Sequence, residues 1–482
     1  MTPKNLLIIM SDEHNPKIMG CSGHPAVHTP NIDALAAAGT RFSDAYTTSP
    51  VCVPARAAFA TGKYVHQIGF WDNADAYDGS VPSWHHRLRG DGHRVVSIGK
   101  LHFRGGDDYG FNETMIPMHV IDGKGDLMGL VRDDLPERGA SWKIAKWAGP
   151  GETPYTFYDR EIAARAQIWL REEAQQHTDK PWVLFVSFVC PHFPLTAPPE
   201  FYYQYPLDRV ELPKQYRKDE RPTHPFVRDY ANSFVYDRYF DEVKLRKAIA
   251  GYYGLCSFVD DNVGQVLRAL EASGLSESTR VLYTSDHGDN LGSRGLWGKS
   301  TMYQETAGVP LIISGADIPR GHVVGTPASH VDIYPFIMQC VGADVPEMYD
   351  GHPGHSLFDL AAGREPARNV LSEYHGMGST TGAFMIRNGK FKYVHYVAYQ
   401  PQLFDLESDP EELHDLADDP AFADVLRGCD AKLRKICNPE EVDRRAKARQ
   451  SELLALNGGR EAVIARGDLG FSPPPGVQPV FE

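Results

Sequence analysis

Short apolar runs alternate with amphipathic stretches along most of the chain. Residues 5–10 (NLLIIM) and 182–189 (WVLFVSFV) are continuous apolar runs, which are typical of strands buried on both faces. Residues 29–39 and 161–176 show helical periodicity instead. Further strands are predicted at 93–99, 280–285 and 309–315. This alternation predicts an α/β fold, a largely parallel sheet flanked by helices.

Three longer stretches complete the large domain. Residues 248–274 have helical periodicity and predict one long helix or two adjoining ones. Residues 107–152 and 197–225 lack periodicity and are rich in Gly, Asp and Pro. Long irregular loops commonly serve a site, so we expect both to lie near one; the alternative is that they are insertions without a role.

The pattern changes near residue 368. Residues 369–374, 383–396 and 401–410 predict short strands, with a hairpin signal at Asn388-Gly389, and residues 420–436 predict a helix. We therefore predict a catalytic domain over 1–366 and a small α+β domain over 367–440. A C-terminal helix and an extended tail follow over 441–482, the tail containing the run SPPPG.

Composition narrows the class of protein. The 482 residues are 42% hydrophobic and 23% charged, as in ordinary globular proteins. A net charge of −14 argues against nucleic-acid binding but leaves an anionic substrate open. The 7 cysteines include no C-x-x-C pair, which argues against a disulfide framework or a zinc–cysteine site. The first apolar run is too short for a signal peptide and no run spans a membrane, so we expect a cytoplasmic protein.

Polar residues follow four of the predicted strands where these strands end. In open α/β sheets, ligands bind beside the carboxyl ends of the strands. A single polar residue after a strand commonly has a structural role. Four strands that all end in this way indicate a functional site. We expect one rim to be formed by Asp12, Lys100, His102, His192, Asp286 and His287.

Four of the polar residues have the donor atoms of a metal site: Asp12, Glu13, Asp286 and His287. Carboxylate oxygens suit Ca²⁺, Mg²⁺ or Mn²⁺, and the imidazole nitrogen moves the preference towards Mn²⁺ or Zn²⁺. The alternative is that the aspartates form turns by accepting hydrogen bonds from local backbone. Their position after strands favours the metal site.

Residues 49–64 (SPVCVPARAAFATGKY) predict a helix with a cysteine at its start. Pro54 suits the first helical turn, and Thr61-Gly62 ends the helix. Cys52 then lies where the helix dipole and free N–H groups stabilise anions, and Arg56 lies one turn further on. A thiolate nucleophile would also suit this position.

Several motifs resemble those of the sulfatase family, in the family's order along the chain. The segment CVPARAAFATGKY (52–64) resembles the C-x-P-x-R signature, and GKLH (99–102) resembles a second signature, with Leu101 in place of Trp. The family's other segments are matched by PHFPLTAP (191–198), SDHG (285–288), GLWGK (295–299) and LFDLESDPEELHDLADDP (403–420). The chain is thus identified as similar to formylglycine-dependent sulfatases of the alkaline phosphatase superfamily, which implies an alkaline-phosphatase-like fold.

The resemblance implies a cofactor and a modified residue. A formylglycine-generating enzyme would convert Cys52 to formylglycine during maturation, and the hydrate would attack a sulfate ester to give a covalent sulfo-enzyme intermediate. Deprotonation of the second hydroxyl then releases sulfate without attack of water on sulfur. One divalent metal, Ca²⁺ or Mn²⁺, would be bound by Asp12, Glu13, Cys52, Asp286 and His287.

The resemblance also implies roles around the substrate. Arg56 would hold the hydrate, and Lys100 and Lys299 would bind sulfate oxygens. His102 would take the proton from the second hydroxyl, and His192 would face the leaving-group oxygen. Asn73, in GFWDN, falls where related enzymes place a substrate contact.

Two departures from the family pattern and two alternatives remain. Ala55 replaces a serine within the signature, and Glu13 stands where Asp or Gln is usual. Phosphonate monoester and phosphodiester hydrolases use the same nucleophile but tend to carry Tyr and Thr where this chain has Lys100 and His102, so this pair favours sulfate esters. A non-catalytic anion-binding member is disfavoured because the charged residues of the site are all retained.

The expected partners follow from these features. The substrate is a small-molecule sulfate ester, and neither nucleic acid nor membrane is expected. The extended tail (470–482) is of a kind that reaches a neighbouring subunit, so we expect a homo-oligomer.

Overall fold

Eight strands form the central sheet of the computed structural model, in which residues 2–345, 352–364 and 368–482 are described. In the sheet they follow the order β11 (His322–Val324), β2 (Gly39–Phe42), β10 (Leu311–Ser314), β9 (Thr279–Ser285), β1 (Asn5–Asp12), β7 (Val183–Pro191), β4 (Val95–Lys100) and β5 (Glu113–Met118). Only β10 runs antiparallel to its neighbours, so the sheet is mixed and largely parallel, as predicted.

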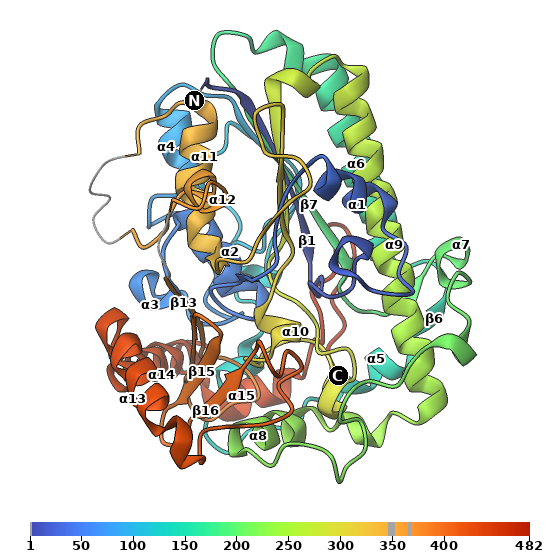
Figure 1. Cartoon of the computed structure of the whole chain (residues 1–482). Coiled ribbons are helices and arrows are strands. Elements are labelled where there is room, and N and C mark those ends of the chain that lie inside the picture. Colours follow the sequence, from blue (N-terminus) through green and yellow to red (C-terminus); the bar gives the residue numbers. More distant parts are fainter. Residues whose placement is uncertain (1, 346–351, 365–367) are drawn as a thin grey trace.

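Helices cover both faces of this sheet (Figure 1). One face packs against α6 (Pro154–Ile168) and α9 (Glu242–Ala272), and the other packs against α2 (Cys52–Thr61), α4 (Trp84–Gly90) and α11 (Ile333–Val341). Helix α1 (Pro30–Ala37) lies beside α9. The predicted long helix is therefore one continuous helix, α9.

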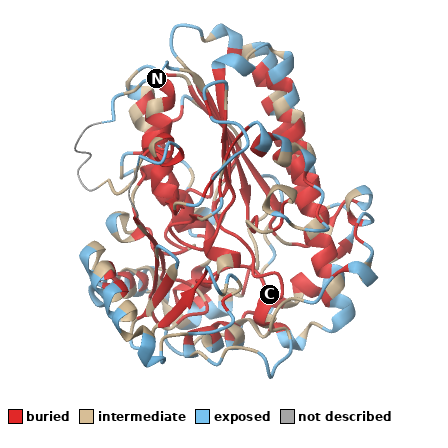
Figure 2. Cartoon of the chain, in the orientation of Figure 1, coloured by how far each residue is buried: buried red, intermediate tan, exposed pale blue. Residues whose placement is uncertain are grey.

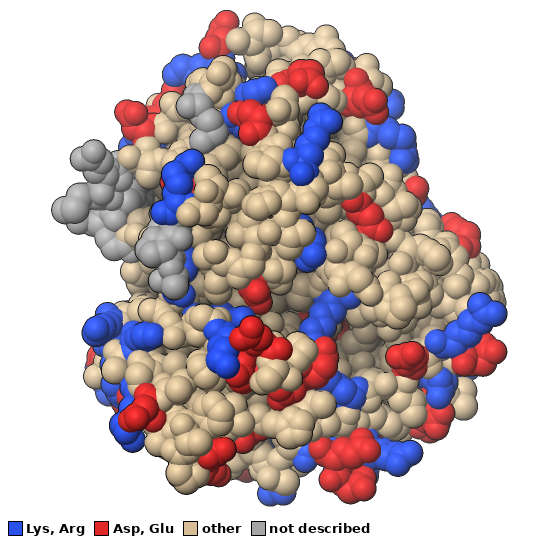
Figure 3. All heavy atoms as spheres, in the orientation of Figure 1, with Lys and Arg blue, Asp and Glu red and all other residues tan. Residues whose placement is uncertain are grey.

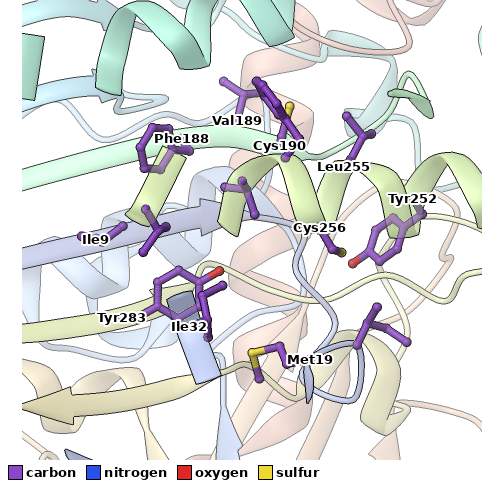
Figure 4. Close-up of a cluster of buried hydrophobic side chains, with 14 of the residues drawn as sticks. Ile9, Met19, Ile32, Phe188, Val189, Cys190, Tyr252, Leu255, Cys256 and Tyr283 are labelled. Carbon is purple, nitrogen blue, oxygen red and sulfur yellow. The ribbon is translucent and has the colours of Figure 1, made fainter. Parts of the chain in front are cut away.

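The side chains of β1 show why the central strands are apolar throughout. Leu7 and Ile9 belong to the core under α6 and α9, whereas Leu6 and Ile8 belong to the core under α2 and α11. Successive side chains of a strand point to opposite faces, so a strand covered on both sides has no polar face. The central strands are red throughout in Figure 2, and Figure 4 shows Ile9 in the core beside α9.

The prediction of an uninterrupted loop over residues 107–152 was wrong in part. The segment contains the edge strand β5, the helix α5 (Trp142–Lys146) and the two-residue strand β6 (Gly149–Pro150). Strand β5 pairs only with β4, most of its residues are partly exposed, and it contains Pro117. An edge strand of this kind has neither a continuous apolar run nor a clean alternation, so its sequence gives little signal.

A smaller C-terminal domain is built on a four-stranded antiparallel sheet. Its strands are β13 (Asn369–Tyr374), β14 (Ala383–Asn388), β15 (Phe391–Tyr396) and β16 (Gln402–Asp405). Strands β14 and β15 form the predicted hairpin, with Gly389 at φ +56° in its turn. Helices α13 (Ala423–Ile436) and α14 (Pro439–Leu456) contribute to the apolar core of this sheet.

The proposed domain limits stay predictions. The division at 366/367 lies outside the described residues, and the division at 440/441 falls inside α14. Two helices, α14 and α15 (Gly459–Arg466), stand where one was predicted. They are separated at Gly458, whose φ of +93° ends the first of them.

The C-terminal tail, residues 467–482, folds back onto its own chain. Asp468 and Glu482 exchange two backbone hydrogen bonds of 2.9 Å, and the Tyr155 hydroxyl donates to the carbonyl of Ser472. The Arg138 guanidinium pairs with the carboxylate of Asp468. These contacts engage the tail within one chain, so the expectation of a homo-oligomer remains a prediction without support from them.

The remaining short elements lie in the segments between the larger helices and strands. They are β3 (Ala45–Tyr46), α3 (Val65–Ile68), β8 (Thr196–Ala197), α7 (Pro199–Tyr202), α8 (Pro225–Phe234), α10 (Gln304–Ala307), β12 (Ala328–Ser329) and α12 (Leu357–Ala361). Within the described ranges, no helix combines the length and the apolar character needed to cross a membrane. Acidic and basic side chains are interspersed over the face shown in Figure 3, which offers no continuous basic surface.

The buried carboxyl of Asp159, which contacts the end of β7, makes the stability of the protein depend on pH. Asp159 of α6 accepts hydrogen bonds of 2.8 Å from the backbone N–H groups of Val189 and Cys190, and burial raises its pKa to about 7. The folded chain therefore binds this proton more tightly than the unfolded chain does, so its contribution to stability decreases as pH rises from about 4 to about 7.

We expect Asp159→Asn to remove this part of the pH dependence. Between about pH 5 and pH 8, the free energy of unfolding of the wild type should fall by on the order of 2 kcal/mol more than that of the variant. Urea unfolding of both proteins at the two pH values measures the difference. Parallel pH profiles would contradict the prediction.

Candidate active site

The ends of four adjacent strands gather the predicted polar residues. Strands β9, β1, β7 and β4 are neighbours in the sheet, and all four are parallel. Asp12 ends β1, Lys100 ends β4, His192 follows β7 and Asp286 follows β9. All of these side chains are buried. The rim expected from the sequence therefore exists as one cluster of buried polar groups.

Helix α2 brings Cys52 into the centre of this cluster. Cys52 is the first residue of the helix, and Gly62, with φ +67°, ends it. The Sγ atom lies 3.1 Å from Lys299 Nζ, 3.2 Å from His287 Nε2 and 3.8 Å from Asp12 Oδ1. Burial, and next the charge of Asp12, raises the pKa of the thiol to about 12. Without a bound cation, Cys52 is therefore a neutral thiol at neutral pH, which is a poor nucleophile.

Four donor groups lie close enough together to hold a metal ion. One donor atom each from Asp12, Cys52, Asp286 and His287 lies within 4.8 Å of the others. The Nδ1 atom of His287 lies 2.9 Å from the carbonyl of Gly288, which assigns the proton to Nδ1. The lone pair of Nε2 therefore faces the cluster, as a metal ligand requires. This set of donors fits a hard or borderline divalent cation.

Glu13 lies at the edge of the same donor set. Its backbone is left-handed, with φ +68°, and its Oε2 lies 3.0 Å from Lys299 Nζ and 3.2 Å from His192 Nε2. Its Oε1 is buried and has no hydrogen-bond partner in the described part of the chain. Burial raises the pKa of this carboxyl to about 8. The unpartnered oxygen is compatible with an additional ligand position.

Three cationic groups balance the carboxylates. Arg56 Nε donates to Asp286 Oδ2 at 2.8 Å, and Arg56 Nη1 donates to the carbonyl of Lys100 at 2.9 Å. Lys100 Nζ pairs with Asp12 Oδ2, and Lys299 Nζ pairs with Glu13. Buried charges require such partners, because an unpaired ion is costly outside water.

Two histidines face the cluster as neutral imidazoles. Burial, with Lys100 for His102 and Lys299 for His192, holds the pKa of each ring well below the ordinary value. His102 has a left-handed backbone, φ +55°, and neither of its ring nitrogens has a hydrogen-bond partner among the described residues. His192 Nδ1 lies 2.7 Å from the carbonyl of Phe193, so its Nε2 accepts from Lys299 Nζ at 2.8 Å. Both rings can accept a proton.

Asn73 contacts the start of helix α2. Its Oδ1 accepts a hydrogen bond of 3.1 Å from the backbone N–H of Val53, and the residue also lines the cavity beside Cys52. Asn73 thus satisfies one of the free N–H groups at the helix start. Its role as a substrate contact stays a prediction.

A cavity of about 70 Å³ leads to the cluster. The segment 107–152 contributes Val120, Gly125, Asp126, Arg138, Ala140, Ser141 and Ile144, so its predicted position near the site is confirmed. The segment 197–225 contributes no lining residue among those described, so it is not part of this cavity.

Sequence reasoning missed the C-terminal contribution to the cavity. The tail supplies Asp468, Leu469, Gly470, Phe471 and Ser472. The aromatic wall consists of Phe193, Tyr230, Phe234, Tyr236 and Phe471, whereas Trp71, Trp142, Trp147, Tyr155 and the segment 202–205 do not line it. The available signal was the pair of apolar residues Leu469 and Phe471 just before the proline-rich run of the tail.

The fold and this buried set of carboxylates, imidazoles and cations define a hydrolase of the alkaline-phosphatase-like class. Residues 4–343 match the family model described as Sulfatase, and residues 292–438 match the model described as N-sulphoglucosamine sulphohydrolase, C-terminal. The chain therefore belongs to the sulfatase family and is a sulfuric ester hydrolase.

Curated relatives cover most of the chain. A choline-sulfatase of Rhizobium meliloti (strain 1021) is 34% identical over 86% of this chain and 83% of its own length. Arylsulfatase K of Bos taurus is 30% identical, covering 91% of this chain and 82% of its own length.

Solved structures share the fold. A putative sulfatase from Bacteroides thetaiotaomicron VPI-5482 has a TM-score of 0.74 and 24% identity, covering 92% of this chain and 94% of its own. A phosphonate monoester hydrolase of Agrobacterium radiobacter has a TM-score of 0.72 and 22% identity, covering 90% and 95%.

Proposed function

We propose that this sulfatase acts through formylglycine generated from Cys52 and through one bound divalent cation. The observation that carries the proposal is the position of Cys52: its Sγ lies at the start of α2, among the donor atoms of Asp12, Asp286 and His287. A neutral thiol there is a poor nucleophile, whereas the β-carbon of the same residue is well placed for an activated oxygen.

The cation would be held by Asp12, Glu13, Asp286, His287 and the modified residue 52, and carboxylate-rich donors favour Ca²⁺ or Mn²⁺. When bound, the cation withdraws charge from sulfate oxygens, and the formylglycine hydrate supplies one hydroxyl for attack and a second for release of sulfate. A second set of donor atoms within 4.8 Å of one another comes from Asp12, Glu13 and His192. Lys299 contacts this set through Glu13 Oε2.

Lysine and arginine side chains would bind and orient the sulfate. Lys100 and Lys299 are buried ammonium groups beside Cys52, and fixed positive groups of this kind stabilise charge that develops on sulfate oxygens. Arg56 has one nitrogen, Nη2, without a hydrogen-bond partner in the described residues and 3.6 Å from Asp12. That nitrogen is available to hold an oxygen of the residue at position 52.

The neutral histidines would move protons. His102 accepts the proton of the second hydroxyl at an unpartnered ring nitrogen, and His192 Nε2, beside Lys299, faces the leaving-group oxygen. The shift of the His102 pKa below the ordinary range keeps this ring unprotonated and ready to accept. The leaving-group oxygen must gain a proton instead, and the ammonium of Lys299, which donates to His192 Nε2, would supply it.

The maturation enzyme and the compartment are part of the proposal. A formylglycine-generating enzyme would recognise Cys52, Pro54 and Arg56 before or during folding, because Cys52 is buried in the folded chain. None of the 7 cysteines is paired in a disulfide, which is typical of a reducing compartment and supports the proposal of a cytoplasmic protein. The substrate class is a small-molecule sulfate ester; the alcohols of choline and of aryl sulfates are candidates through the relatives named above.

Hydrolysis of phosphonate monoesters is the second candidate. Its support is the fold shared with the Agrobacterium enzyme. Lys100 and His102 favour sulfate, yet both reactions develop charge on similar oxygens, so we expect some activity on both.

Two measurements test the proposal together. We expect kcat/KM for an aryl sulfate to exceed that for the matching aryl phosphonate monoester by about 10²-fold or more. In the same active preparation, the peptide that contains Cys52 should be lighter than its sequence mass by about 18 Da, the difference between a thiol and an aldehyde side chain. A preference for the phosphonate would reverse the assignment, and an unmodified cysteine in fully active enzyme would exclude formylglycine.

A further inference from the structure

Two neighbouring cavities share Leu469 and Phe471 of the C-terminal tail as a common wall. The first is the active-site cavity beside Cys52, with a volume of about 70 Å³. The second has a volume of about 400 Å³ and lies against the same tail. Among the described residues, only Leu469 and Phe471 line both cavities. These two side chains therefore separate the reacting residue from a larger space.

Phe471 lies on the side of the site where the alcohol part of the ester would lie. Lys299 Nζ lies 3.1 Å from Cys52 Sγ and 2.8 Å from His192 Nε2. The His192 ring stacks on Phe193 with 4.3 Å between the ring centroids, and Phe193 meets Phe471 edge to face at 5.9 Å. Since His192 is proposed to face the leaving-group oxygen, the alcohol attached to that oxygen would extend towards Phe471.

Neighbouring groups hold the half-buried Phe471 ring in place. Tyr155 meets it edge to face at 5.6 Å between centroids, and Trp147 does so at 5.9 Å. The Tyr155 hydroxyl also donates to the carbonyl of Ser472, the next residue. Residues 473–475 are all prolines, whose rings fix the backbone angle φ. The ring of Phe471 therefore cannot turn aside without losing aromatic contacts that each stabilise it.

The second cavity has the room and the lining to hold an aromatic ring. Its side chains are mostly apolar and include Trp147, Tyr155, Pro194 and Val477. An apolar group that reached this cavity would be removed from water, which favours binding. The Phe471 side chain stands between this space and the active-site cavity.

We propose that Phe471 determines specificity by limiting the length of the alcohol part of the substrate. Its ring blocks the way from the active-site cavity into the second cavity, so the wild type prefers compact alcohols. An alcohol with a second ring in line with the ester oxygen meets the Phe471 ring. This inference rests on the proposed sulfatase activity of the same cavity, and it adds a limit on the size of ester that the cavity accepts.

Phenyl sulfate and biphenyl-4-yl sulfate are the matched substrates for the test. The second ring of the biphenyl ester lies para to the ester oxygen, so it lengthens the alcohol and changes the leaving group little. Phe471→Ala removes from the wall one phenyl ring, which is the group that the biphenyl ester adds. Phe157→Ala makes the same change on α6, at a residue that is 61% exposed and lines neither cavity.

We expect kcat/KM of the wild type for phenyl sulfate to exceed that for biphenyl-4-yl sulfate by about 10-fold or more, because overlap with a fixed ring is costly. Phe471→Ala should raise kcat/KM for the biphenyl ester by about 10-fold or more, and the smaller Phe471→Leu change should give a smaller rise. Phe157→Ala should leave the ratio of the two esters unchanged. The fully modified, metal-loaded enzyme is used throughout.

The results that would overturn the inference differ from failure of the activity itself. A wild type that hydrolysed the biphenyl ester as well as the phenyl ester would show that Phe471 sets no limit, even if the variants did not fold. An unchanged ratio in Phe471→Ala, through equal losses or no change, would assign the discrimination to other residues. If the wild type hydrolysed no sulfate ester, the proposed function would fail instead.

Discussion

Cys52→Ala removes hydrolysis of sulfate esters almost completely, with an expected fall in kcat/KM of about 10⁴-fold to 10⁶-fold. The physical reason is that the side chain at position 52 is the one group placed both at the start of α2 and among the donor atoms of Asp12, Asp286 and His287. Alanine keeps the helix, because it is a good helix former, but provides neither an oxygen nucleophile nor a metal ligand. Steady-state kinetics with an aryl sulfate measures the loss.

Two variants sharpen this result. Cys52→Ser supplies one hydroxyl where the formylglycine hydrate has two, so release of sulfate would need attack of water on sulfur. We expect it to turn over as poorly as alanine while the new hydroxyl accumulates a covalent sulfate that is visible by mass spectrometry. Cys437→Ala, in the smaller domain, should retain full activity. Substantial turnover by Cys52→Ala would exclude the mechanism.

The elements that could be predicted from the sequence are those whose buried side chains follow a regular pattern along the chain. Strands β1 and β7 are covered on both faces, so their apolar runs follow directly from packing, and α9 follows from its long apolar stripe. Strand β5 has one neighbour and partly exposed residues, so its environment leaves no comparable pattern. The short helices of the segment 107–152 are fixed by tertiary contacts that no local periodicity expresses.

The residues of the candidate site also fall into those that the sequence could predict and those that it could not. Asp12, Lys100, His192 and Asp286 could be predicted because each lies at or just beyond the end of a recognisable strand, and parallel strand ends meet at one edge. The contact of Asn73 with Val53 depends on the path of a loop.

The pairing of Arg138 with Asp468 joins two segments far apart in sequence, neither of which has regular periodicity. The tail was expected to reach a neighbouring subunit, because its proline-rich composition favours an extended chain. It turns inward because an ion pair and the aromatic contacts of Phe471 with Tyr155 and Phe193 hold it there.

Substitution of Asp12 is expected to have the second large effect on activity, because its one carboxylate serves two functions. Its Oδ1 belongs to the donor set with Cys52 and His287, while its Oδ2 pairs with Lys100. Burial alone would raise its pKa, but the positive charges of Lys100, Lys299 and Arg56 hold it well below the ordinary value. Asp12 is therefore ionised throughout the neutral range, as both a metal ligand and a counter-charge must be.

We expect Asp12→Asn to lower bound divalent metal from about one equivalent per chain to a small fraction, and to lower kcat/KM by about 10³-fold or more. The amide also leaves the buried Lys100 without its partner carboxylate, so the metal-free variant should be less stable than the metal-free wild type by about 3–5 kcal/mol. Elemental analysis and urea unfolding after treatment with a chelator measure these two effects separately.

Asp241→Asn is the matched control. Asp241 accepts the N–H of Lys244 at 2.9 Å as the exposed cap of α9, and asparagine caps a helix as well as aspartate does. It should retain metal, activity and stability. If Asp12→Asn bound metal like the wild type and lost only stability, Asp12 would be a counter-charge to Lys100 and the metal would lie elsewhere, because a ligand that supplies a charged oxygen at the centre of its set cannot be neutralised without loss of affinity.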